Sequence, residues 1–368
     1  MIQPAPQPAF SLAEARHLVK DLFNPRPVIY WADFLGSAIG GMVCFALVRR
    51  RLEPFSLEQG IVFVICCLLF YRAVLFTHEM THLRQNEFRM FRIVWNLLCG
   101  IPMLMPSFTY YTHVEHHMRK YFGTDHDGEY IPLGTQSPWN IAWYLCQPFW
   151  LPIAAVIRFM LLTPLTWVSP TIRDWALKHA SSMIMDPTYI RPLPTRKVLL
   201  VFRLQELLCF LWCVGVATAM YLGKVPPLGF LATAYSVSVV ILFMNAIRTL
   251  GAHRYTNDEG QMTFVEQMLD SINYPNRPFL SALWAPVGLR FHALHHLFPS
   301  MPYHNLAEAH QRLMRDLPAD SPYRQTESPS LFAALRELYR NARENSARAR
   351  AYRPLRPTGL GGQSLSAN

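Results

Sequence analysis

His78-Glu79-Met80-Thr81-His82 is the stretch of sequence that decides the fold, because histidines four residues apart lie on one face of a helix. Both imidazoles can then reach a single metal ion. The same residues match H-E-x-x-H, the zinc-protease motif in which the glutamate is the general base. The stretch alone leaves two kinds of site open: a redox-inert zinc site, or a centre that uses more histidines.

Two further histidine clusters settle how many metal ions to expect. H-x-x-H-H occurs once from His113 and again from His292, and His253 stands alone after the last long apolar segment. Nine organised histidines exceed the four ligands of a zinc site, so we predict two metal ions that share them. The predicted ligands are His78, His82, His113, His116, His117, His253, His292, His295 and His296.

Composition indicates a membrane protein. Hydrophobic residues make up 51% of the 368 residues and charged residues only 16%, against about 25% charged in soluble domains. The net charge of +10 comes without a nucleic-acid recognition motif, so we expect no nucleic-acid partner. All seven cysteines lie in apolar segments, which predicts buried thiols and no disulfide framework.

Four apolar segments are long enough to cross a bilayer, and short polar turns join them into two hairpins. The segments are residues 29–48, 60–76, 198–222 and 228–247. Residues 97–108 are too few to span and predict a re-entrant or interfacial helix. Residues 139–168 contain three prolines, and either one kinked span or interfacial half-helices fits them. The interfacial interpretation is favoured, because one extra span would place the later histidines on the wrong side.

The predicted fold is therefore an all-α integral membrane protein: two transmembrane hairpins, interfacial helices, and a cytoplasmic helical cap that carries the metal centre. Residues 1–27 form a cytoplasmic arm, residues 28–328 the membrane-embedded domain, and residues 329–368 a basic helix and tail. Lys and Arg are concentrated in the histidine-bearing loops, so both termini and the site are expected on the cytoplasmic side of the inner membrane.

The three histidine boxes between two hairpins resemble the membrane-bound fatty acid desaturase and hydroxylase superfamily, over roughly residues 28–315. The segment from Leu297 to Leu306 is similar to the end of the third box in acyl-lipid desaturases. The resemblance implies two irons that activate O2 to attack a C–H bond of an acyl chain, and it implies His253 as the ninth ligand. Relatives carry a water-holding asparagine four residues before that histidine, where this chain has Thr249, with Asn245 one turn earlier.

Several polar residues near the boxes are weaker candidates. Glu79, Glu115, Asn245 and Asp127 are predicted to support the ligands through hydrogen bonds. For Asp125, Asp127 and Glu129, supporting and purely structural roles are equally favoured. The histidines outside the boxes are interpreted as loop, packing or surface residues: His17, His126, His179, His304 and His310.

O2-dependent oxidation of a fatty acyl chain is the predicted function, with desaturation as the first choice. Hydroxylation, carotenoid ketolation or hydroxylation, and oxidative decarboxylation to a terminal alkene remain open on the same scaffold. Electrons would come from a ferredoxin- or cytochrome b5-like donor with its reductase, because the sequence has no haem, flavin or dinucleotide motif. A distant alternative is an intramembrane zinc protease using His78, Glu79 and His82, but residues 198–247 lack an aspartate as third ligand.

Overall fold

The computed structural model describes residues 10–50, 52–84, 87–257 and 260–351. Within these ranges the chain is helical, with three isolated β-bridges and no longer strand. The all-helical prediction is confirmed. Residues 1–9 of the predicted arm and residues 352–368 of the predicted tail lie outside the described residues. The predicted domain boundaries stay predictions.

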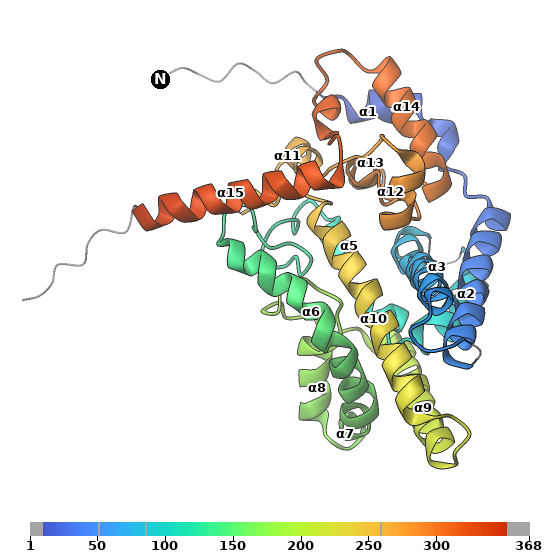
Figure 1. Cartoon of the computed structure of the whole chain (residues 1–368). Helices are drawn as coiled ribbons and strands as arrows, with labels where there is room; N and C mark the ends of the chain where they lie inside the picture. Colours follow the sequence, from blue (N-terminus) through green and yellow to red (C-terminus); the bar gives the residue numbers. More distant parts are fainter. Residues whose placement is uncertain (1–9, 51, 85–86, 258–259, 352–368) are drawn as a thin grey trace, which may run out of the picture.

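The first predicted hairpin consists of α2 (Pro27–Arg50) and α3 (Leu57–His82), which pack along each other (Figure 1). The close approach depends on Gly41, where a Cβ would lie 2.7 Å from the Phe70 ring. Cys66 donates its thiol to the Gly41 carbonyl, at 3.5 Å. A small residue here lets α3 lie directly against α2 and fixes the helix that ends in the first histidine box.

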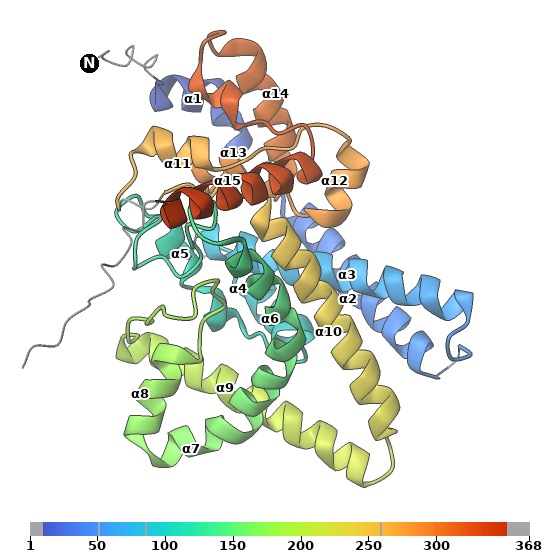
Figure 2. The same ribbon diagram turned by 60° about the vertical axis from the view of Figure 1, so that its left-hand side comes forward.

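The second hairpin consists of α9 (Arg196–Tyr221) and α10 (Pro227–Leu250). Their turn lies at the end of the molecule that is opposite the short helices α11 to α14 (Figure 1). α10 packs against both α3 and α6, so it connects the first hairpin to the middle of the chain (Figure 2).

A fifth long helix runs from Pro138 to Val168, and here the structure differs from the favoured interfacial half-helices. It comprises α6 (Pro138–Val156), the π-helix η4 (Ile157–Leu162) and α7 (Thr163–Val168). Its 31 residues, with mean hydropathy 1.7, make it the fifth helix long and apolar enough to cross a membrane. The prolines do not interrupt it: Pro148 and Pro152 lie inside α6, and Pro164 occupies the first turn of α7, where proline is tolerated.

This fifth helix belongs to an excursion that begins and ends beside the histidine boxes. At its start, the Gly134 amide donates to the Tyr255 carbonyl at 2.9 Å, just after His253. After α8 (Pro170–His179) the chain returns, and the Met183 amide donates to the Thr109 carbonyl at 2.8 Å. The excursion therefore leaves and rejoins the same end of the long helices.

A buried charge inside the fifth helix is paired with one in α9. Arg158, in the π turn, is 6% exposed and forms a salt bridge with Glu206 of α9. Arg158 also donates to the Ala180 carbonyl and the Ser181 hydroxyl, at 2.8 and 3.0 Å. The arginine thus joins α9 to the returning loop instead of meeting lipid, where an unpaired charge is costly.

Short helices form a layer at one end of the long helices (Figure 1). Before the second box, the apolar segment predicted at 97–108 is a π turn followed by loop and a 3-10 turn, too short to span. The bounds are α1 (Leu12–Leu18), η1 (Lys20–Phe23), α4 (Arg89–Trp95), η2 (Asn96–Gly100), η3 (Ser107–Tyr110), α5 (His113–His116), α11 (Phe264–Asp270), α12 (Pro278–Trp284), α13 (His292–Leu297), η5 (Tyr303–Asn305), α14 (Leu306–Asp316) and η6 (Pro322–Thr326).

The helix α15 (Leu331–Ala351) lies across the ends of α6 and α10 (Figure 2). Its Ala334, Leu338 and Ala342 are buried against the molecule. Phe332 and Tyr339 are exposed, as are Arg336, Arg340 and Arg343, so α15 presents an aromatic and basic outer face.

Candidate metal centre

The ends of two long helices position His78, His82 and His253. His78 and His82 occupy the last two turns of α3, where the Leu83 amide closes the helix on the Glu79 carbonyl at 3.1 Å. His253 follows the end of α10 by three residues. Because α3 and α10 pack together, these two helix ends meet at the same level.

The two H-x-x-H-H segments form short helices, α5 and α13, that face this level. Asn273 fixes α13: its side-chain carbonyl accepts the Leu294 amide at 3.1 Å, and its amide donates to Thr326 at 2.9 Å. Asn273 is fully buried, so the third box depends on a side chain that lies outside every motif.

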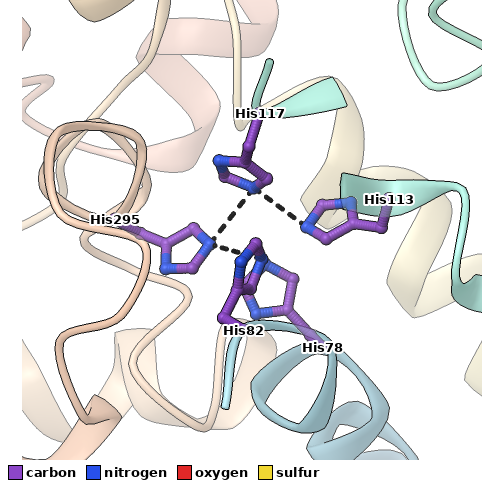
Figure 3. A group of neighbouring side chains, drawn as sticks. All are labelled: His78, His82, His113, His117 and His295. Atoms are coloured by element: carbon purple, nitrogen blue, oxygen red, sulfur yellow. Dashed lines mark hydrogen bonds between the residues drawn. The ribbon is translucent and has the colours of Figure 1, made fainter. Parts of the chain in front are cut away.

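All nine predicted histidines converge into two groups, each with its ring nitrogens within 4.8 Å of one another. Figure 3 shows the larger group, in which the rings of α3, α5 and α13 point toward a common centre. The larger group consists of His78, His82, His113, His117 and His295, and the smaller of His116, His253, His292 and His296.

The spacing of the ring nitrogens fits a pair of metal ions. The Nε2 atom of His295 lies 3.2 Å from the Nε2 atoms of His82 and His117. In the smaller group, the Nε2 atoms of His292 and His253 are 2.9 Å apart. Neighbouring ligands at right angles around an ion, each about 2.1 Å away, would be about 3 Å apart.

His78 gives a second test of the fit. It is 2% exposed, and neither of its ring nitrogens has a hydrogen-bond partner among the described residues. A buried polar atom without a partner carries a cost of about 1–3 kcal/mol. A metal ion in the larger group would satisfy one of these nitrogens, so the residues present suit the two ions that the sequence resemblance implies.

Burial and mutual repulsion keep most of these rings neutral. Desolvation, followed by the charge of neighbouring rings, lowers the pKa well below its usual value for His113, His117, His292, His295 and His296. His116 differs: burial lowers its pKa, but the carboxylates of Asp127, Glu129 and Asp270 together outweigh burial and raise the pKa. Neutral imidazole is the form that binds a metal ion.

Carboxylates contact the rear nitrogens of three ligands. The Nδ1 atom of His113 lies 2.9 Å from Glu129, and that of His116 lies 2.9 and 3.1 Å from the two oxygens of Asp127. A carboxylate behind a histidine fixes the ring's orientation and strengthens it as a ligand. Asp127, predicted as a supporting residue, and Glu129 both occupy such positions.

The third carboxylate, Asp270, was not among the predicted residues. One of its oxygens lies 3.3 Å from Nδ1 of His253, and Ser271 Oγ lies 3.2 Å from the same atom. Asp270 ends α11, seventeen residues after His253, and no short-range spacing in the sequence connects the two. Only the pairing of the segment after α10 with the end of α11 reveals it, where the Arg254 amide donates to the Asp270 carbonyl at 2.7 Å.

The other three predicted supporting residues bond elsewhere among the described residues. Glu79 accepts the Tyr30 hydroxyl at 2.7 Å, and Glu115 accepts the Tyr189 hydroxyl at 2.6 Å. Asn245 accepts Arg248 at 2.9 Å. None of the three forms a hydrogen bond with a ring nitrogen of a candidate ligand among the described residues, so their predicted supporting role stays a prediction.

The five histidines that are not predicted ligands belong to neither group. His310 is buried between the Tyr323 hydroxyl and Glu327, at 2.8 and 2.9 Å. His304 accepts the Arg26 amide at 3.2 Å and so ties η5 to the start of α2. Both have packing roles, as interpreted from the sequence, while His17, His126 and His179 are exposed.

Comparison with known proteins decides the family. The family model for fatty acid desaturases matches residues 59–327, which include every ligand candidate. The chain belongs to the fatty acid desaturase family. This membership confirms the resemblance and makes the protein a membrane oxidoreductase of lipid chains.

A relative narrows the chemistry. The chain is 39% identical over 341 residues to a ceramide hydroxylase of Caulobacter vibrioides (strain NA1000 / CB15N). The matched region covers 92% of this chain and 95% of the relative. No solved structure matches the chain. The comparisons therefore favour the hydroxylase alternative over the desaturation that was the first choice from sequence.

Proposed function

We propose that the protein hydroxylates a hydrocarbon chain of a ceramide. The supporting observation is the division of nine histidines into groups of five and four, in a chain similar over 92% of its length to a ceramide hydroxylase. The overall reaction converts a C–H bond and O2, with two electrons and two protons, into C–OH and water. Because zinc has no redox chemistry, this reaction also argues against the zinc-protease alternative.

Each part of the site has a defined task in this proposal. The larger group would hold one iron and the smaller group the other, and the iron pair would supply the O2 activation. Glu129, Asp127 and Asp270 hold the rear nitrogens of His113, His116 and His253, respectively. The ligand rings are mostly buried, so the surrounding helices keep bulk water from the reacting C–H bond.

The four-span topology remains our proposal, with α6 to α8 as a re-entrant excursion. The excursion starts near Tyr255 and ends near Thr109, both beside the histidine boxes. Because the excursion returns to the side of the membrane from which it started, all three boxes lie on that same side. The two metal groups require this, since each combines histidines from more than one box. The excess of Lys and Arg in these loops favours the cytoplasmic side of the inner membrane for the site and both termini.

We also propose where the electron donor binds. His82, His117 and His296 are the ligand candidates whose side chains are only partly buried, so this is where an electron carrier approaches the site most closely. Arg119 and Lys120 directly follow the second box and are exposed. Their positive charge would attract an acidic one-electron carrier such as a ferredoxin.

Expression with ceramide as the lipid substrate tests the proposed function. Mass spectrometry of the lipids should show the gain of one oxygen atom, labelled when 18O2 is supplied, and a His295→Ala variant should abolish it. A product that has lost two hydrogens and gained no oxygen would restore desaturation. A fatty-acid product with no change in ceramide would move the substrate to free acids.

A further inference from the structure

Arg248 is a buried cation that forms no salt bridge with any described residue, and it lies near the metal centre. It lies in the last turn of α10 and is 8% exposed. It donates to the neutral side chain of Asn245, at 2.9 Å, and its Nε atom is buried without a hydrogen-bond partner among the described residues. A buried guanidinium with an unused donor is costly unless something else binds it.

The other buried arginines do not share this feature. Arg158 forms a salt bridge with Glu206. Arg191 donates to the carbonyls of Ser181 and Phe108. Arg248 therefore stands out among the described residues as a buried arginine that has a free donor and no carboxylate in contact.

Three tyrosine hydroxyls interact with the charge of Arg248: those of Tyr71, Tyr110 and Tyr144. The Glu129 carboxylate also interacts with this charge but forms no salt bridge with Arg248. Tyr71 already donates to the Trp284 carbonyl at 3.0 Å. The tyrosine hydroxyls are uncharged, so they complement a neutral polar ligand better than a second anion or cation.

This polar cluster adjoins the larger histidine group. The Tyr110 ring stacks on His113 with centroids 4.7 Å apart, and lies 6.4 Å from the His78 ring. Arg248 itself lies in the last turn of α10, five residues before the ligand candidate His253. Anything held by Arg248 would therefore lie beside the histidines.

We infer that Arg248, supported by Asn245, binds an acceptor oxygen of the polar head of the substrate, the amide carbonyl or a hydroxyl of a ceramide. This inference rests on the proposed function. The free Nε–H supplies the donor, and the neutral tyrosines match an uncharged amide and hydroxyl group. Arg248 is thus a positioning residue: by anchoring the head, it sets which carbon of the chain lies at the metal centre.

The test uses full-length enzyme in lipid nanodiscs and two substitutions, Arg248→Gln and Arg248→Lys. A charge-assisted hydrogen bond to substrate predicts a loss of about 10- to 100-fold in kcat/KM for ceramide in the glutamine variant. The lysine variant should recover part of that loss. Because the anchor sets the register, the glutamine variant should also yield a wider set of positional isomers of the hydroxylated product.

Arg203→Gln is the matched control, because Arg203 is an exposed arginine of another long helix. It should retain the kcat/KM and the single product of the unmodified enzyme. Iron content is measured on every variant, because a structural role for Arg248 would appear as lost iron. Loss of iron in both Arg248 variants would overturn the positioning role.

Substrate analogues keep the test independent of folding. The unmodified enzyme should hydroxylate ceramide and a dialkyl amide without hydroxyls far better than an alkane of equal length, and Arg248→Gln should reduce this preference. Equal turnover of the alkane by the unmodified enzyme would refute the anchor. A preference for free fatty acid would replace the amide with a carboxylate and refute the ceramide assignment. Absence of any hydroxylated ceramide would instead refute the proposed function.

Discussion

Replacing Asp127 by asparagine should selectively weaken the smaller metal group. Asp127 is 2% exposed, and its two oxygens lie 2.9 and 3.1 Å from Nδ1 of His116. The same carboxylate accepts the backbone amides of Gly123 and Glu129, each at 3.0 Å. Asparagine has nearly the same shape, but it carries no charge and turns one acceptor into a donor.

The asparagine amide cannot satisfy all of these donors. Either His116 loses its acceptor, or the new NH2 group faces a backbone N–H. Loss of such a rear contact typically costs about 10- to 100-fold in metal affinity, or about 1.4–2.8 kcal/mol. The five-histidine group does not include His116, so its affinity should change little.

The assay is iron stoichiometry during titration with a chelator, followed by Mössbauer spectroscopy to resolve the two irons. Asp127→Asn should fall from two irons toward one per chain at a chelator concentration that leaves the unmodified protein loaded. Asp125→Asn is the control, because Asp125 is exposed and two residues away. If Asp127→Asn retains both irons with unchanged affinity, the carboxylate does not support His116 in this way.

Three further predictions follow from the site. Glu79→Gln should keep both irons and part of the turnover, because Glu79 bonds to Tyr30 and not to a ring nitrogen; complete loss of activity with metal retained would favour a general-base role. The double substitution Arg119→Glu and Lys120→Glu should raise the KM for an acidic electron carrier. The increase should become smaller at high salt, because salt screens charge. The control Lys224→Glu, in the α9–α10 turn, should leave this KM unchanged. For iron-free protein, the lowered pKa of the buried histidines means that the unfolded chain binds more protons below about pH 6.5. Its melting temperature in detergent should therefore fall as pH falls from 7 to 5, and a constant melting temperature would contradict neutral buried rings.

The histidine ligands could be predicted from sequence because their spacing is local. Residues i and i+4 share a helix face, so His78 with His82 and each H-x-x-H-H segment already indicate a ligand set. The apolar segments likewise follow from composition and length, because a bilayer requires about 20 apolar residues per span. The fifth helix could not be judged in this way, since proline content alone does not show whether the helix stays continuous.

The choice between the zinc motif and the iron pair also followed from sequence, once all the histidines were counted together. The division between the two metal groups did not. In the second box, the i, i+4 pair His113 and His117 lies in the larger group, and His116 lies in the smaller group. In the third box the assignment is reversed: the i, i+4 pair His292 and His296 lies in the smaller group, and His295 lies in the larger group.

Tertiary structure alone placed the residues behind and beside the ligands. Asp270 reaches His253, and Asn273 holds α13, through packing between segments that share no local pattern. In the sequence, Arg248 is one basic residue at the end of a span, and only the structure shows that it is buried with an unused donor. Short-range periodicity determines which side chains share a helix face, whereas contacts between distant segments depend on how the helices pack.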